Sequence, residues 1–85
     1  MPTYSREFLE KCRPLTDQLG GDRIAALVAR GIVRQMDMND LSQLQEYYKK
    51  KGSEALFREI TDLRCVGSKT AEVIMQRIVS ARGET

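Results

Sequence analysis

The sequence predicts an all-α fold of about five short helices that form a single domain over residues 1–85. Apolar residues recur at helical spacing, most clearly at Leu56, Phe57, Ile60 and Leu63. Sustained alternation of apolar and polar residues, which would indicate a strand, does not occur in the sequence. A chain of 85 residues can bury one modest hydrophobic core.

Residues that cap or stop helices set the expected boundaries. The expected helices cover residues 5–12, 23–30, about 40–51, 53–63 and 68–82, and a connector covers residues 33–38. A short polar side chain can accept a hydrogen bond from a helix amide, and the candidate N-caps of this kind are Ser5, Asp22, Asn39 or Asp40, and Ser53. Pro14 is expected to interrupt the first helix, and Gly31 and Gly52 to end the second and third.

Charge and composition limit the possible functions. The net charge is only +2 and both signs are interspersed, so a basic face must arise from folding. The sequence has no apolar run that could span a membrane and no signal-peptide core. We therefore expect a cytoplasmic, nucleoid-associated or nuclear protein that is not secreted and does not bind membranes.

The cysteine and histidine content argues against metal chemistry. Cys12 and Cys65 are far apart in sequence, and we expect both to be free thiols, as is usual in a reducing compartment. The chain has no histidine, which is the commonest metal ligand and general base. Neither a metal site nor a cofactor is therefore expected.

The most informative stretch runs from residue 63 to residue 78. An apolar helix face ends at Leu63, a tight turn contains Val66 and Gly67, and a second apolar face begins at Ala71. Gly67 is expected to take a positive φ or to let another backbone approach closely. The helix that follows begins with unpaired amides, and Lys69 lies in its first turn, so this position predicts an anion site.

At these residues the sequence resembles the helix-hairpin-helix family of DNA-binding modules. The pattern reads Leu63, Cys65-Val66-Gly67, then Ser68-Lys69-Thr70-Ala71. The resemblance implies binding to the DNA phosphate backbone without base reading, as part of a repair, recombination or replication assembly. The DNA-binding residues that it implies are Arg64, Cys65, Val66, Gly67, Ser68, Lys69 and Thr70. Cys65 stands where the family usually has its first glycine, so a positive φ there would be strained.

A weaker parallel occurs near the N-terminus, where Gly21-Asp22-Arg23-Ile24-Ala25 is similar to Gly67-Ser68-Lys69-Thr70-Ala71. Two interpretations remain open. The first stretch is either a degenerate second motif, with Gly21 and Arg23 as a second DNA contact, or an ordinary helix start. Asp22 would add negative charge at such a contact.

Two enzyme hypotheses fail on particular residues. Repair-polymerase domains with this hairpin use a lyase lysine four residues after the motif's own lysine, and the corresponding residue is Val73. A P-loop would need an upstream glycine and a preceding strand. We therefore expect a non-enzymatic protein.

The alternative function is protein–protein docking or dimerisation by the same fold without DNA. An apolar patch formed by Met36, Met38, Tyr47 and Tyr48 would favour this function, although these residues could equally belong to the core.

Overall fold

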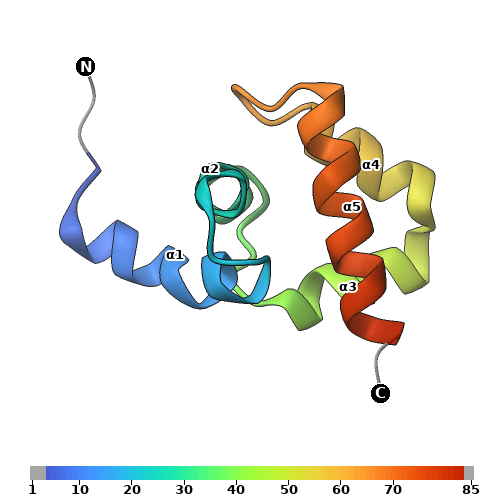
Figure 1. Ribbon diagram of the computed structural model, residues 1–85, viewed down its shortest axis with the longest axis horizontal. Helices are drawn as coiled ribbons and strands as arrows, with labels where there is room; N and C mark the ends of the chain where they lie inside the picture. The colour runs from blue at the N-terminus through green and yellow to red at the C-terminus, as the bar shows by residue number, and fades with distance from the viewer. Residues whose placement is uncertain (1–3, 84–85) are drawn as a thin grey trace.

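The computed structural model describes residues 4–83, and this part of the chain contains helices and no strand (Figure 1). The elements in order are α1 (Arg6–Gln18), α2 (Arg23–Gly31), the π-helical segment η1 (Ile32–Met36), α3 (Leu41–Lys51), α4 (Ser53–Thr61) and α5 (Ser68–Gly83). The predicted all-α fold with about five short helices is confirmed. No helix in the described residues is long and apolar enough to cross a membrane.

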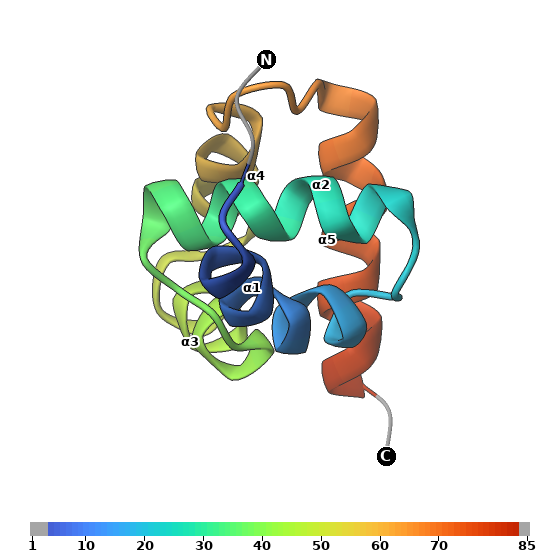
Figure 2. The same ribbon diagram turned by 90° about the vertical axis from the view of Figure 1, so that its left-hand side faces the viewer.

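Helices that follow one another in the chain form two contacting pairs that share one core. We call α1–α2 the first hairpin and α4–α5 the second hairpin, with α3 connecting them. Helix α2 lies between α1 and α5, and it crosses in front of α5 when the molecule is viewed from the side of the first hairpin (Figure 2). Each of the helices contributes fully buried side chains to a single cluster, such as Leu15, Val28, Leu44, Leu56 and Ile74. The two hairpins therefore share one hydrophobic core.

Side-chain caps begin three of the helices, as expected from the sequence. The Phe8 amide donates to Ser5 Oγ at 3.1 Å, at the start of α1. Asp40 begins α3 and forms a capping box with Gln43. The Leu41 amide also donates to Gln18 Oε1 at 2.8 Å, which ties the start of α3 to the end of α1.

Two predicted breaks in the first hairpin are wrong. Pro14 lies inside α1, where it is exposed, so water can solvate the carbonyl that loses its helical partner. Gly31 does not end α2, because its φ of −67° and ψ of −42° are helical and the chain continues into η1. The actual stop is Asp37, which has a left-handed φ of 57°. Gly31 instead faces Leu63, whose Cδ1 would lie 3.3 Å from an added Cβ.

The start of α4 also differs slightly from the expectation. Ser53 is the first helical residue and not the cap, and the cap position is Gly52, which makes no side-chain hydrogen bond. Gly52 ends α3 as predicted, with a φ of 95° that favours glycine.

Candidate nucleic-acid interface

The turn between α4 and α5 is held by two buried side chains. Leu63 and Val66 are only 4% and 6% exposed. The Leu63 amide donates to the Ile60 carbonyl at 3.1 Å, and the Val66 amide donates to the Leu63 carbonyl at 3.2 Å. Between these anchors, Arg64 and Cys65 are exposed. Val66 therefore positions the turn from inside and does not reach the surface.

The chain reverses at Cys65 and not at Gly67. Cys65 has a φ of 64°, in the left-handed region, where a residue with a Cβ is strained. Gly67 lies outside that region, so of the two alternatives expected for Gly67 the positive φ is wrong. A Cβ added to Gly67 would meet no protein atom within 4 Å. The protein itself therefore leaves open space at Gly67.

Helix α5 begins without a side-chain cap. The Gly67 carbonyl accepts the first helical hydrogen bond, from the Ala71 amide at 2.9 Å, and glycine has no side chain to cap the next amides. Within residues 4–83, no hydrogen bond has the amide of Ser68, Lys69 or Thr70 as its donor. Gly67, Ser68 and Lys69 are exposed, so these amides and the Lys69 ammonium meet solvent at the positive end of the helix dipole.

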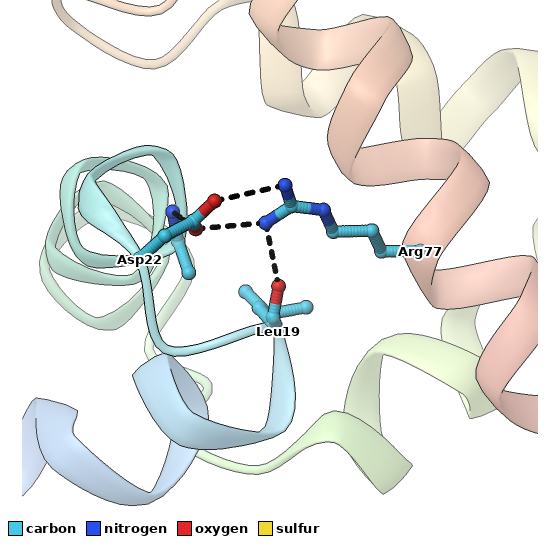
Figure 3. A network of polar contacts seen from close by, with 4 residues as sticks. Leu19, Asp22 and Arg77 are labelled. Atoms are coloured by element: carbon cyan, nitrogen blue, oxygen red, sulfur yellow. Dashed lines mark hydrogen bonds and ion pairs between the residues drawn. The ribbon is translucent and has the colours of Figure 1, made fainter.

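The start of α2 has the opposite arrangement, because the chain supplies its own anion there. The Asp22 carboxylate accepts a hydrogen bond from the Ala25 amide at 3.0 Å. Arg77 of α5 donates to the two Asp22 oxygens at 2.9 and 3.0 Å and to the Leu19 carbonyl at 3.0 Å (Figure 3). The hydrogen bonds from Arg77 and then from Ala25 lower the pKa of Asp22 to about 2. Asp22 therefore fills at α2 the position that remains open at α5.

The glycines of the first turn serve this packing. Gly20 and Gly21 have φ values of 124° and 73°. A Cβ on Gly20 would lie 2.7 Å from Arg77 Nη1, and the Gly21 amide donates to the Thr16 carbonyl at 2.9 Å. Gly21 thus has its amide already paired, while Arg23 is exposed. Arg77 therefore joins the two hairpins.

The structure divides the predicted site residues between two neighbouring surfaces. Gly67, Ser68 and Lys69 lie at the exposed start of α5, with Thr70 half-buried beside them. Arg64 and Cys65 face a cavity that the turn shares with α2. The sequence did not identify this second surface, although the i, i+4 spacing of Arg30 and Arg34 places both arginines on one side of a helix.

Acidic residues near the turn face different neighbours. Glu72 lines a groove between α4 and α5, whereas Asp62 lies beside Arg64 on the cavity.

Among the described residues, no group of three or more Cys, Asp or Glu side chains could hold a metal ion. Both cysteines are free thiols in the structure, and Cys12 is buried whereas Cys65 is exposed.

No protein-family model, characterised protein or solved structure matches this chain.

Proposed function

We propose that the protein is a non-enzymatic DNA-binding domain in which the start of α5 holds a phosphate of the DNA backbone. The observation that carries this proposal is the uncapped, exposed N-terminus of α5, with Lys69 in its first turn. Free amides and the helix dipole attract an anion, and phosphate is the anion most often bound at helix starts. The sequence similarity of residues 63–71 to the helix-hairpin-helix family supports DNA as the source of that phosphate.

The starts of α2 and α5 differ in charge, and this difference favours the second hairpin as the part that contacts DNA. At α2 an approaching phosphate would meet the Asp22 carboxylate, and the Gly21 amide is already paired. At α5 the same position has only Gly67, which has open space around it. The first hairpin then acts mainly as a structural partner, with Arg23 as a peripheral cation.

Such a contact would position DNA without reading its sequence. Backbone amides and a lysine recognise phosphate oxygens, which carry no base information. The low net charge of the chain is consistent with contacts to only a few phosphates. Such limited contact suits a domain that is one part of a larger repair, recombination or replication assembly.

The test is the salt dependence of DNA binding by Lys69→Ala. Each neutralised phosphate contributes about 0.9 to the slope of log affinity against log salt concentration. Lys69→Ala should weaken binding by a similar factor on unrelated duplex sequences and should flatten this slope by about one. Fluorescence anisotropy at several salt concentrations measures both quantities.

Lys50→Ala provides the matched control. Lys50 is an exposed lysine at the end of α3, separated from the turn by the whole of α4. Its removal changes the net charge equally but should alter the slope less. If a folded Lys69→Ala protein keeps the wild-type affinity and slope, the proposed contact at α5 is wrong.

A second candidate function is docking to a protein or to a second copy of the chain. The observation that favours it is the groove between α4 and α5, with a volume of about 730 Å³ and with Phe57, Met75 and Val79 among its lining residues. Met36, Met38, Tyr47 and Tyr48 are only partly exposed and pack against the core. A dimer that persists at high salt in sedimentation, with no binding to DNA, would support this function instead.

A further inference from the structure

A cavity of about 560 Å³ lies between α2, η1 and the turn of the second hairpin. Three guanidinium groups line it, from Arg30, Arg34 and Arg64, against the single carboxylate of Asp62. This volume is in the range of small-molecule sites. The cavity is distinct from the start of α5, although both are built on the same turn.

Two of the arginines are held by aromatic rings. The guanidinium carbons of Arg30 and Arg34 lie 5.2 and 5.5 Å from the centre of the Tyr4 ring. Arg34 also lies 5.4 Å from the ring of Phe8, which stacks on Tyr4 at 5.3 Å. Cation–π contacts fix the position of a guanidinium but provide no acceptor for its N–H groups.

The three arginines have no protein counter-ion in the described residues. Within residues 4–83 the ion pair is Arg77–Asp22, and neither of these two residues lines the cavity. The carboxylate of Asp62 is not within pairing distance of any of the three guanidinium groups. Arg30 Nε is buried, and within residues 4–83 it has no hydrogen-bond acceptor. Three guanidinium groups that line one cavity without a counter-ion in the part of the chain that the structure describes favour the binding of an anion there, because charged donors form the strongest hydrogen bonds with anionic acceptors.

We propose that this cavity binds a phosphate monoester, either at the end of a nucleic-acid strand or on a mononucleotide. A monoester phosphate carries up to two negative charges and three strong acceptor oxygens, which suits several guanidinium forks better than a carboxylate does. A concavity of this volume admits a strand end or a single nucleotide but not the stacked interior of a duplex. The site does not depend on the proposed function, and only the choice of a nucleic-acid strand as the source of phosphate rests on it.

The first experiment uses deoxyadenosine monophosphate, with deoxyadenosine as the uncharged control, in an NMR titration of the wild-type protein. The monophosphate should shift the Arg30 side-chain Nε–H signal and the backbone amides of Arg34 and Arg64, and the nucleoside should not. Arg34→Gln should weaken this binding about tenfold. Arg13→Gln, which removes an exposed arginine from α1 outside the cavity, should leave it unchanged.

The second experiment identifies the source of the phosphate. One oligonucleotide sequence is compared with a 5′-phosphate, with a 3′-phosphate and with hydroxyl ends. If the ligand is a strand end, the protein should bind one of the two phosphorylated oligonucleotides more tightly than the form with hydroxyl ends. Arg34→Gln should abolish this difference in affinity, and Arg13→Gln should retain it. Equal affinity for all three forms, together with the monophosphate shifts, would instead assign the site to a mononucleotide.

Two results would overturn the inference. One is the absence of shifts at Arg30, Arg34 and Arg64 with the monophosphate, together with equal affinity for all three oligonucleotides. The other is a set of shifts confined to residues 68–70, which would place the phosphate at α5 and leave the proposed function intact. Conversely, monophosphate binding at the arginines with no effect of Lys69→Ala on duplex binding would overturn the proposed function alone.

Discussion

Cys65 turns the chain at a φ of 64°, a conformation that costs an ordinary residue roughly 1–2 kcal/mol. Glycine adopts it freely but loses more backbone entropy on folding, about 0.5–1 kcal/mol. We therefore expect Cys65→Gly to raise the free energy of unfolding by about 0.5–1 kcal/mol. Urea denaturation followed by circular dichroism measures the change.

Cys65→Ala separates backbone strain from loss of the thiol. Alanine keeps the Cβ and therefore the strain, and the exposed thiol contributes little burial. Its stability should stay near the wild-type value. A glycine variant no more stable than the alanine variant would contradict the attribution of strain to the left-handed φ.

Gly67 allows a test of function with little effect on the fold. An added methyl group meets no protein atom within 4 Å, and the φ of Gly67 is outside the left-handed region. Alanine is a poorer N-cap than glycine, which lowers the stability of the fold. Alanine also gives the unfolded chain less conformational entropy than glycine does, which raises the stability, so the two effects oppose each other. We expect Gly67→Ala to change the free energy of unfolding by less than about 1 kcal/mol.

The same Gly67→Ala substitution should weaken DNA binding several-fold. The methyl group would stand where a phosphate approaches the first amides of α5. Anisotropy at fixed salt measures the affinity, and the melting temperature confirms that the fold is intact. Wild-type affinity in a stable variant would argue against close approach of DNA at this residue.

The sequence identified the turn and the condition under which Cys65 is strained, but it did not decide whether Cys65 or Gly67 takes the positive φ. Glycine permits a left-handed conformation without requiring it. The direction of the backbone between the buried Leu63 and Val66 decides which residue reverses the chain, and that direction depends on tertiary packing.

At the scale of elements, the link between Asp22 at the start of α2 and Arg77 in α5 predicts a specific dependence of stability on pH. The Asp22 pKa is lowered from 3.8 to about 2 by its hydrogen bonds with Arg77 and Ala25. A carboxylate with a depressed pKa stabilises the fold above its unfolded pKa, and this contribution is lost as the pH falls toward the folded value. Asp22 is 49% exposed, so solvent screens the interaction and the effect is modest.

We expect Asp22→Asn to be less stable than the wild type at neutral pH, with the difference shrinking between about pH 4 and pH 2. Asparagine remains a good N-cap, so the comparison isolates the charge. Thermal melting across this pH range tests the expectation. Asp17→Asn, at an exposed position of α1, serves as the control, and a constant difference between Asp22→Asn and the wild type at all pH values would contradict the linkage.

Helix caps were predictable from the sequence because a cap is a local contact. Ser5, Asp22 and Asp40 all occupy the expected cap positions. The partner of Asp22 was not predictable, because Arg77 lies 55 residues away in sequence. The continuation of α2 through Gly31 was missed for a similar reason, since Gly31 is needed for close contact with Leu63 and not for a helix stop.

At the scale of the whole molecule, the fold class followed from composition and periodicity, whereas the placement of the two hairpins did not. Helical periodicity shows which face of a helix is apolar but not which other helix covers it. The buried positions of α2 and the first residue of η1 do match those of α5, since Ala25, Val28 and Ile32 are spaced like Ala71, Ile74 and Ile78. The similarity therefore extends along both helices, although their first turns differ.

A core shared by both hairpins implies that they unfold together. Leu15 of α1 is fully buried in the same cluster as Ile74 of α5. Leu15→Ala removes buried methyl groups and should lower the free energy of unfolding by about 2–4 kcal/mol, a large fraction of the stability of so small a domain. The loss should affect the second hairpin as much as the first.

Two probes of urea denaturation test this cooperativity. Circular dichroism reports all the helices, and alkylation of Cys12 reports opening of the core around α1. The buried Cys12 thiol has a pKa raised by burial, so it should react slowly until the core opens, whereas Cys65 is exposed. In Leu15→Ala the two transitions should move together to lower urea. Early alkylation of Cys12 while the remaining helices persist would show that the first hairpin opens independently, and would contradict a single cooperative core.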